Sequence, residues 1–222
     1  MMSPDQPSTP LPPGFELDHL VLASASLEEG SAWLEDLLGV RPAGGGAHPG
    51  WGTHNRLLKL DRGAYLELIA PDPGQAPPPR PRLFGLDDPE LLALIAQRPR
   101  LIHYVMRTGD LAAARAQLDY DPGVSEAMSR GTLNWRLTVP LDGRRQYAGV
   151  LPSLIDWGTT PHPARALPDS GIELLSLEVR APAAVLARAA AALGASRIAC
   201  EPGPLPQLRA LLRSAAGTAT LD

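Results

Sequence analysis

The sequence has few of the residues that mark some common classes of protein. Its 222 residues contain one cysteine, Cys200, and a single thiol builds neither a disulfide framework nor a cysteine-rich zinc site. We expect Cys200 to be a small buried side chain, because no activating base lies near it in the sequence. The net charge is only −4, whereas binding to nucleic acid or to an acidic membrane needs clustered cations.

Long apolar segments are also absent. No run of about 18 apolar residues occurs, so no membrane-spanning helix is predicted. Residues 1–14 contain five prolines but neither a basic start nor an apolar core, which argues against a signal peptide and favours a disordered or polyproline-like leader. We therefore expect a cytoplasmic, globular protein whose partner is a small molecule and which binds neither nucleic acid nor membranes.

After the leader, the pattern predicts a strand, a helix and two further strands. Residues 15–24 alternate as in a strand, which places His19 on one face and Asp18 on the other. Ser26 is a candidate N-cap of the following helix, and Gly39 is a candidate residue for its C-terminal stop. The remaining elements expected in this part of the chain are a glycine-rich loop over residues 40–52 and strands over residues 54–61 and 64–72.

The same order of elements then returns. A proline-rich segment is followed by a short helix, for which Asp88 is the candidate N-cap and Pro89 the first helical residue. The elements expected next are a strand over residues 101–108, a helix over 109–119, and strands over 131–140 and 149–157. A third unit begins with a strand over residues 171–182 and an alanine-rich helix, and residues 207–222 fit either a helix or a strand.

A repeated tetrapeptide supports an internal duplication. Gly-Thr-x-Asn occurs at residues 52–55 and again at 131–134, an offset of 79 residues. The first strands of the two segments align His19 with His103, an offset of 84, and later strands align Glu67 with Ser153, an offset of 86. These offsets differ only by loop-sized amounts, as expected when loops vary and elements persist.

Three segments of the sequence carry a resemblance to a known family. "LDHLVLAS", from residue 17, and "GTHNRLLKL" with "YLELIAPDP", between residues 52 and 73, resemble the glyoxalase-like domain of the vicinal-oxygen-chelate superfamily. The resemblance covers roughly residues 16–200 and implies an α+β fold in which paired βαβββ modules form a curved mixed-sheet cup. The expected parts are a leader (1–14), a first module (15–72), a proline-rich linker with a short helix (73–100), a second module (101–160) and a C-terminal unit containing a partial third βαβ unit (161–222).

The resemblance also implies positions for a metal site. In metal-using members a His on the first strand and a Glu on the last strand of a module combine with a His of the other module, which maps to His19, Glu67 and His103. Two imidazoles and a carboxylate suit a divalent ion such as Zn²⁺, Mn²⁺, Fe²⁺ or Ni²⁺. The fourth position is Ser153, a poor ligand for such ions. His19 and Glu67 are equally compatible with a metal-free pocket in which they are hydrogen-bonded.

The remaining candidates are expected to bind a small molecule. The glycine-rich segment 44–55 is a candidate lid over the cup, and His162, between two prolines, is expected to be an ordinary surface residue. The candidate ligand-binding residues are His48, Trp51, His54, Asn55, Arg56, Trp135, Arg136, Ser153 and Trp157.

Two functions are compatible with these residues. The first is a glyoxalase-like enzyme acting on a small oxygenated metabolite as an isomerase, lyase or dioxygenase, with a divalent metal in the cup. The second is a metal-free protein of the same fold that binds or sequesters a small molecule against its tryptophans. Both a monomer and a homodimer are compatible with the sequence, and no general base can be named from it.

Overall fold

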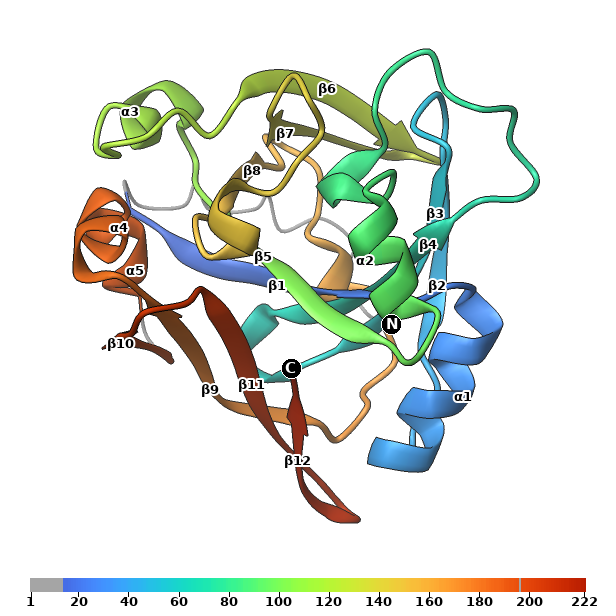
Figure 1. Cartoon of the computed structure of the whole chain (residues 1–222). Helices are drawn as coiled ribbons and strands as arrows, with labels where there is room; N and C mark the ends of the chain where they lie inside the picture. The colour runs from blue at the N-terminus through green and yellow to red at the C-terminus, as the bar shows by residue number, and fades with distance from the viewer. Residues whose placement is uncertain (1–13, 196) are drawn as a thin grey trace, which may run out of the picture.

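The computed structural model describes residues 14–195 and 197–222 (Figure 1). Residues 1–13 of the expected proline-rich leader lie outside the described residues. Among the helices of the described part, none has the length and apolar character needed to cross a membrane.

The two predicted modules form one curved sheet of eight strands. The first module contains β1 (Glu16–Ala23), α1 (Leu27–Leu38), β2 (Ala43–His48), β3 (Thr53–Lys59) and β4 (Tyr65–Pro71). The second contains β5 (Arg100–Arg107), α3 (Leu111–Arg115), β6 (Val124–Arg130), β7 (Leu133–Val139) and β8 (Ser153–Asp156). The strand order is β2-β3-β4-β1-β5-β8-β7-β6, so each module has the same internal order and the first strands of the modules are central neighbours. The α+β fold with paired βαβββ modules is therefore confirmed.

Hydrogen-bond register supports the alignment of the two modules. In the first module Val21, two residues after His19, is the partner of Glu67 in the β1–β4 ladder. In the second module Val105, two residues after His103, is the partner of Ser153 in the β5–β8 ladder. Ser153 thus occupies the position in the second module that Glu67 occupies in the first.

The helix ends follow the expected capping signals. The Ser26 side chain accepts a hydrogen bond from the backbone N–H of Glu29, and Gly39 ends α1 in the left-handed conformation. Asp88 caps α2 (Pro89–Ile95) in the connection between the modules. The helix expected over residues 109–119 is shorter than predicted and spans only Leu111–Arg115.

Two strands that the βαβββ resemblance implies could not be placed from the residue pattern. Part of the segment predicted to be a glycine-rich loop is the edge strand β2, which pairs with β3 although glycine has a low strand propensity. The second module contains β6, whose polar sequence VSEAMSR gave no strand signal. Both strands are recruited by hairpin pairing with a neighbouring strand.

The C-terminal unit forms a second sheet. It contains β9 (Glu173–Ala181), α4 (Ala183–Arg188), α5 (Ala190–Leu193), β10 (Ile198–Pro202), β11 (Gln207–Ser214) and β12 (Gly217–Leu221), in the strand order β10-β9-β11-β12. The segment that fitted helix or strand is the β11–β12 hairpin. Cys200 lies on the edge strand β10 and is exposed, so the prediction of a buried thiol was wrong.

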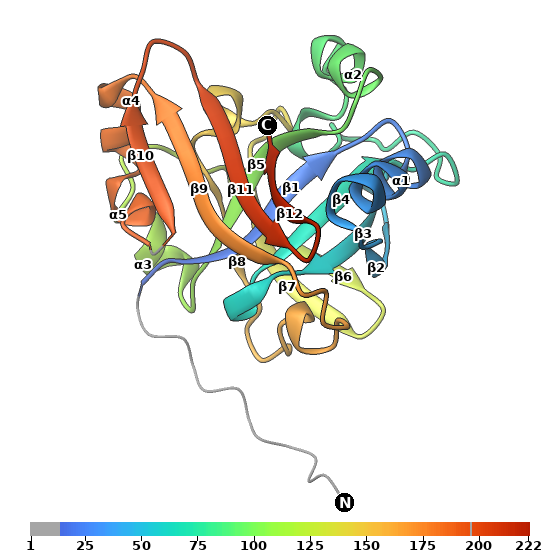
Figure 2. The same cartoon turned by 90° about the horizontal axis from the view of Figure 1, so that it is seen from below.

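The two sheets share one hydrophobic core. Leu20 and Leu22 of β1 face outward from the cup and cluster with Leu177 and Leu212 of the second sheet. Figure 2 shows β9, β11 and β12 lying across β1 and β5. The opposite, inner face of the large sheet has a separate cluster that includes Val21 and three tryptophans. The C-terminal unit therefore covers the outside of the cup and leaves its inside for a site.

One irregularity in β1 decides which side chains enter the cup. In the ladder with β5, Leu17 pairs with Met106 and His19 pairs with Val105, so Asp18 is an extra residue on β1. Such a bulge re-aims side chains at that point of a strand. Asp18 was expected on the face of β1 opposite to His19, but its carboxylate lies 2.6 Å from the His19 ring. The prediction that side chains alternate regularly between the two faces was therefore wrong at Asp18.

The repeated Gly-Thr-x-Asn tetrapeptide lies at equivalent hairpins, the β2–β3 and the β6–β7 turns. Both glycines have left-handed φ angles, 61° at Gly52 and 59° at Gly131. Their surroundings differ. A Cβ on Gly52 would lie 2.7 Å from the Pro78 ring, whereas a Cβ on Gly131 would meet nothing within 4 Å.

We predict different costs for the same substitution at the two turns. Gly131→Ala should lower the free energy of unfolding by about 1 kcal/mol, because only the left-handed conformation is penalised. Gly52→Ala should cost about 1–3 kcal/mol more, since the Pro78 ring must also move. Urea unfolding followed by circular dichroism measures both values, and equal losses would show that the contact of Pro78 with this turn is not rigid.

Candidate functional site

A small polar cavity, here called the inner chamber, lies inside the cup between the two modules. Its volume is about 30 Å³, enough for roughly two water molecules. Its polar and aromatic lining residues are His19, His48, Asn55, Tyr65, Glu67, Arg130, Trp135 and Trp157, and its remaining lining residues are Leu83, Phe84, Met128, Leu137 and Ile155. Most of these residues are buried, so the chamber is largely screened from bulk solvent.

Three charged side chains form a row at the inner chamber: His19 and Glu67 line it, and Asp18 lies behind the His19 ring. Asp18, fully buried, accepts a hydrogen bond of 2.6 Å from Nδ1 of His19. On the other side of the ring, Nε2 of His19 lies 3.5 Å from Oε2 of Glu67, which is close for an ion pair and long for a hydrogen bond. The His19 imidazole is therefore held between two buried carboxylates.

The buried environment shifts the pKa of His19 upward and the pKa values of Asp18 and Glu67 downward. Burial alone would lower the pKa of His19, but hydrogen bonds and charges from Asp18 and Glu67 outweigh it and raise this pKa to about 9. Burial raises the pKa of Glu67, but His19, His48 and Asn55 outweigh that effect and lower it to about 2. The pKa of Asp18 is held well below its usual range, because His162 and His19 outweigh its burial. The resting row is thus carboxylate, imidazolium, carboxylate.

Asp18 is also anchored from the segment that follows β8. Trp157 donates its indole N–H to Oδ2 of Asp18 at 2.9 Å. His162 donates from Nε2 to the same oxygen at 3.0 Å, and its Nδ1 accepts from the backbone N–H of Ala164. His162 was expected to be an ordinary surface residue, but it helps to hold the Asp18 carboxylate in place on the side away from the chamber.

A second set of hydrogen bonds holds Glu67 from the opposite side. Asn55 donates from Nδ2 to Oε1 of Glu67 at 2.6 Å and to Nε2 of His48 at 3.1 Å. His48 in turn donates from Nδ1 to the Thr53 hydroxyl. Burial lowers the pKa of His48 to about 4 in spite of the nearby Glu67, so His48 is neutral. Arg130 donates from Nη1 to Oδ1 of Asn55 at 2.7 Å.

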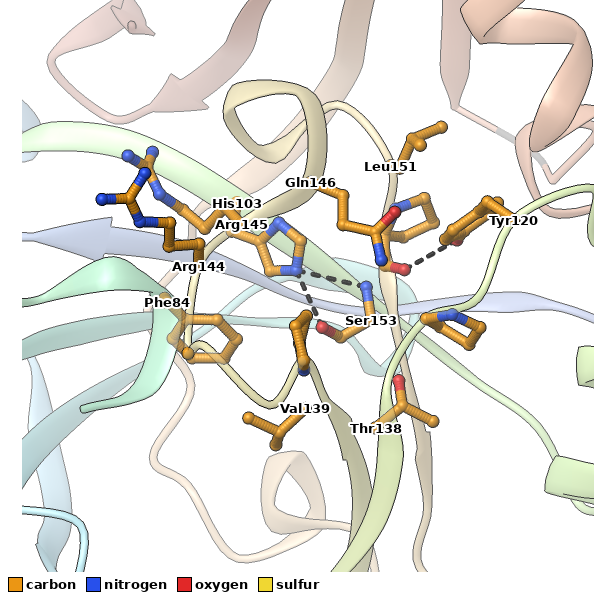
Figure 3. Close-up of a pocket in the computed structure, with 14 residues that line it drawn as sticks. Phe84, His103, Tyr120, Thr138, Val139, Arg144, Arg145, Gln146, Leu151 and Ser153 are labelled. Atoms are coloured by element: carbon orange, nitrogen blue, oxygen red, sulfur yellow. Dashed lines mark hydrogen bonds between the residues drawn. The ribbon is translucent and has the colours of Figure 1, made fainter. Parts of the chain in front are cut away.

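His103 and Ser153 lie in a neighbouring cavity, shown in Figure 3. Nδ1 of His103 donates to the carbonyl oxygen of Gly149 at 3.1 Å. Its Nε2 lies 3.0 Å from the Ser153 hydroxyl and 3.2 Å from the Ser153 backbone nitrogen. Burial lowers the pKa of His103 to about 3. Phe84 lines both cavities, whereas His103 lines only this one and not the inner chamber.

These contacts do not fit the divalent-metal site that the resemblance implied at His19, Glu67 and His103. A ligating imidazole needs a free lone pair, but both nitrogens of His103 are already hydrogen-bonded and His19 presents N–H groups to two carboxylates. Among the described residues no group of three or more His, Cys, Asp or Glu side chains could hold a metal ion. The expected ligand set is therefore not assembled.

The structure separates the nine predicted ligand-binding residues into three groups. His48, Asn55, Trp135 and Trp157 line the inner chamber, where the two tryptophan rings lie 5.4 Å apart between centroids. Ser153 lines the neighbouring cavity with His103.

The other four predicted residues have contacts away from the chamber. Trp51 lies beneath the guanidinium of Arg80, 4.6 Å from it, and His54 lies 3.6 Å from Asp72. Arg56 bonds to Glu28 and Ser31 of α1, and Arg136 bonds to Ser125 of the adjacent strand. Arg56 and Arg136 alternate with chamber-lining neighbours along their strands, so they point to the outer face.

Four residues of the site were missed from the sequence. Asp18 is brought inward by the bulge, and His162 reaches it from a loop distant in the chain. Tyr65 stacks on the His19 ring at 4.6 Å, because it is the partner of His19 in the β1–β4 ladder. Arg130 lies directly before the second Gly-Thr-x-Asn tetrapeptide, and the strand that carries it was not recognised.

We predict that stability is greatest near pH 6.5. The folded-state pKa of His19 is raised to about 9 from 6.5, so its contribution is complete below pH 6.5 and is lost as the pH rises to 9. The pKa values of His48 and His103 are lowered to about 4 and 3, so the unfolded chain binds more protons below pH 6.5 and stability falls with decreasing pH.

The free energy of unfolding in urea, measured from pH 5 to 9, tests this assignment. His19→Gln should abolish most of the decline above pH 6.5 and keep the decline below it. His48→Gln is the matched control, which should keep the alkaline decline and reduce the acidic one. An unchanged alkaline decline in His19→Gln would mean that His19 is not the protonated partner of the two carboxylates.

Comparison with known proteins places this geometry in a family. Among solved structures, the chain is similar to a hypothetical protein from Staphylococcus aureus, with a TM-score of 0.63 and 12% identity, covering 94% of this chain and 98% of that one. This likeness concerns the fold alone. No curated protein sequence matches the chain significantly.

Two enzymes are more distant structural neighbours. Methylmalonyl-CoA epimerase from Mycobacterium tuberculosis has a TM-score of 0.39 and 24% identity, covering 66% of this chain and 89% of that one. A variant of 4-hydroxymandelate synthase from Streptomyces coelicolor has a TM-score of 0.44 and 16% identity, covering 95% of this chain and 62% of that one. The sequence model of a family described as "Glyoxalase-like domain" matches residues 17–196. This match spans well over half of the chain, which therefore belongs to the glyoxalase-like domain family.

Proposed function

We propose that this protein is an enzyme that moves a proton between carbon and oxygen in a small oxygenated compound, with Glu67 as the base and His19 as the acid. The observation that supports the proposal is the row formed by Asp18, His19 and Glu67 at a chamber that is largely screened from bulk solvent. A carboxylate and an imidazolium that face the same cavity are the two groups that acid–base catalysis requires.

The low pKa of Glu67 is compatible with its role as a base because that pKa depends on His19. While His19 is protonated, its charge and its N–H stabilise the carboxylate. When His19 gives its proton to a substrate oxygen, this stabilisation disappears and burial favours the protonated form of Glu67. The acid and the base therefore change strength together, and proton gain by Glu67 is favoured at the moment when His19 loses its proton.

The reaction that this pair supports is enolisation. Oε2 of Glu67 removes a proton from a carbon next to a carbonyl group, the electron pair of that C–H bond forms a C=C bond, and Nε2–H of His19 protonates the carbonyl oxygen. The products of the step are an enol, a neutral Glu67 and a neutral His19, so protons and charge balance. Asp18 keeps the proton on Nδ1 and fixes the orientation of the ring.

The screening of the chamber from bulk solvent favours this step. Bulk water would solvate both charges and weaken their interaction with the reacting atoms, whereas fixed groups in a cavity screened from bulk solvent act more strongly. His48, neutral and bonded to Asn55, adds no competing charge. Tyr65 stacks on His19 and its pKa is raised well above the usual value by burial and by the two carboxylates, so it also stays neutral.

Binding without catalysis is the second candidate function. The observation that favours it is the aromatic wall formed by Trp135 and Trp157, whose rings are buried and adjacent. An apolar wall with a few polar groups is the usual composition of a small-molecule pocket, and it needs no proton transfer.

Proton exchange with solvent provides the test. In D₂O, ¹H NMR would follow enzyme-dependent loss of the C–H signal next to the carbonyl in a panel of small 2-oxo acids and 2-hydroxy carbonyl compounds. We expect exchange with at least one compound, and Glu67→Gln should slow it by about 100-fold or more. Arg136→Gln is the matched control, because Arg136 is exposed and bonds only to Ser125, and it should leave the rate unchanged.

Two results would count against catalysis. Exchange that persists at the wild-type rate in Glu67→Gln would remove Glu67 from the mechanism. Saturable binding of a compound that quenches tryptophan fluorescence, with no exchange in any compound of the panel, would favour the binding protein.

A further inference from the structure

The cup has a seam where its two edge strands meet. The sheet ends at β2 on one side and at β6 on the other, and these strands lie against each other without forming a hydrogen-bonded ladder in the described structure. Figure 1 shows β6 running toward β2 and β3. Arg130, the last residue of β6, extends across this seam to the Asn55 amide on β3.

The glycines of β2 make room for this crossing. A Cβ on Gly46 would lie only 3.2 Å from Cδ of Arg130, which is tighter than ordinary contact. The backbone N–H of Gly46 bonds to the same Asn55 oxygen that accepts from Arg130. The glycine run predicted to form a lid is therefore a strand without side chains at the place where the Arg130 side chain passes.

Arg130 is a cation without an anionic partner. Within the described part of the chain, no carboxylate lies within 4.0 Å of its nitrogens, and its recorded bond is to a neutral amide oxygen. Its guanidinium carbon lies 5.9 Å from the centre of the Trp135 ring, and the residue lines the inner chamber. The two carboxylates of the chamber are instead matched by His19 and His162.

We propose that Arg130 binds the carboxylate group of the substrate, which enters at the β2–β6 seam; the substrate class is therefore a small carboxylic acid that also carries a carbonyl group. This inference rests on the proposed function of the same chamber. A guanidinium presents paired N–H groups that match the two oxygens of a carboxylate. Among the described residues, Asn55 is the one side chain that is hydrogen-bonded to both Arg130 and Glu67. A carboxylate on Arg130 thus brings the adjoining carbons of the ligand toward Glu67.

A pair of probes of the same size separates charge from shape. Acetate and acetamide would be titrated into the full chain at constant ionic strength while tryptophan fluorescence and saturation-transfer NMR are recorded. We expect saturable binding of acetate and little binding of acetamide. Arg130→Gln should weaken acetate binding by about tenfold or more, because a hydrogen bond to a charged group is lost.

Two further variants test whether acetate binding depends on the Arg130 side chain at the seam. Arg130→Lys keeps the charge but not the planar pair of donors, so it should bind acetate with an intermediate affinity. Arg136→Gln, on the outer face of the neighbouring strand, should bind acetate as the wild type does. Equal binding of acetate by Arg130→Gln and wild type, or equal binding of acetate and acetamide by the wild type, would overturn the inference.

Glu67→Gln distinguishes this inference from the proposed function. The variant should bind acetate at least as tightly as the wild type, because a nearby negative charge has been removed. If acetate binding depends on Arg130 while no compound exchanges its proton, the carboxylate site stands and the enzymatic proposal fails. If exchange depends on Glu67 while acetate binding ignores Arg130, the enzyme stands and the carboxylate site fails.

Discussion

The interior of the cup depends on one imidazole between two buried carboxylates. Asp18 and Glu67 are almost inaccessible to solvent, and an uncompensated charge in such a place is costly. His19 compensates both of them, and the remaining partners are drawn in by the same requirement: Trp157 and His162 bond to Asp18, and Asn55 bonds to Glu67. One electrostatic requirement thus fixes side chains from β1, β3, β4 and the segment after β8 in a single arrangement.

The second module has the same strand geometry as the first but no charged row of side chains. His103 and Ser153 occupy the positions of His19 and Glu67, but a hydroxyl needs no counter-ion. His103 is accordingly neutral and satisfied by a carbonyl oxygen on one side and by Ser153 on the other. Two changes therefore explain why two halves with the same strand order have different electrostatics: Glu67 is replaced by Ser153, and Asp18 by Ile102. The charged chamber accordingly lies on the side of the first module.

Sequence patterns predicted what depends on local or repeated order. The paired modules follow from the aligned repeat, and the helix caps at Ser26 and Gly39 follow from local capping signals. The proximity of His19 and Glu67 was expected from the family resemblance. Three features could not be obtained in this way. The bulge at Asp18 breaks the alternation on which strand prediction rests. His162 and Arg130 reach the site across 144 and 75 residues of sequence, and such contacts leave no signal in the local pattern.

A ligand bound to Arg130 at the seam would also affect the row of Asp18, His19 and Glu67, because all four charged side chains lie close together. As the structure stands, Asp18, Glu67, His19 and Arg130 carry two negative and two positive charges, which sum to zero although Arg130 contacts neither carboxylate. A carboxylate ligand on Arg130 would use that balancing charge and add a negative charge near Glu67. Like charges raise the pKa of a carboxyl group, so the ligand itself would make Glu67 a stronger base and His19 more firmly protonated. An anionic substrate would then strengthen Glu67 as the base and keep His19 protonated, whereas a neutral compound of the same shape would not.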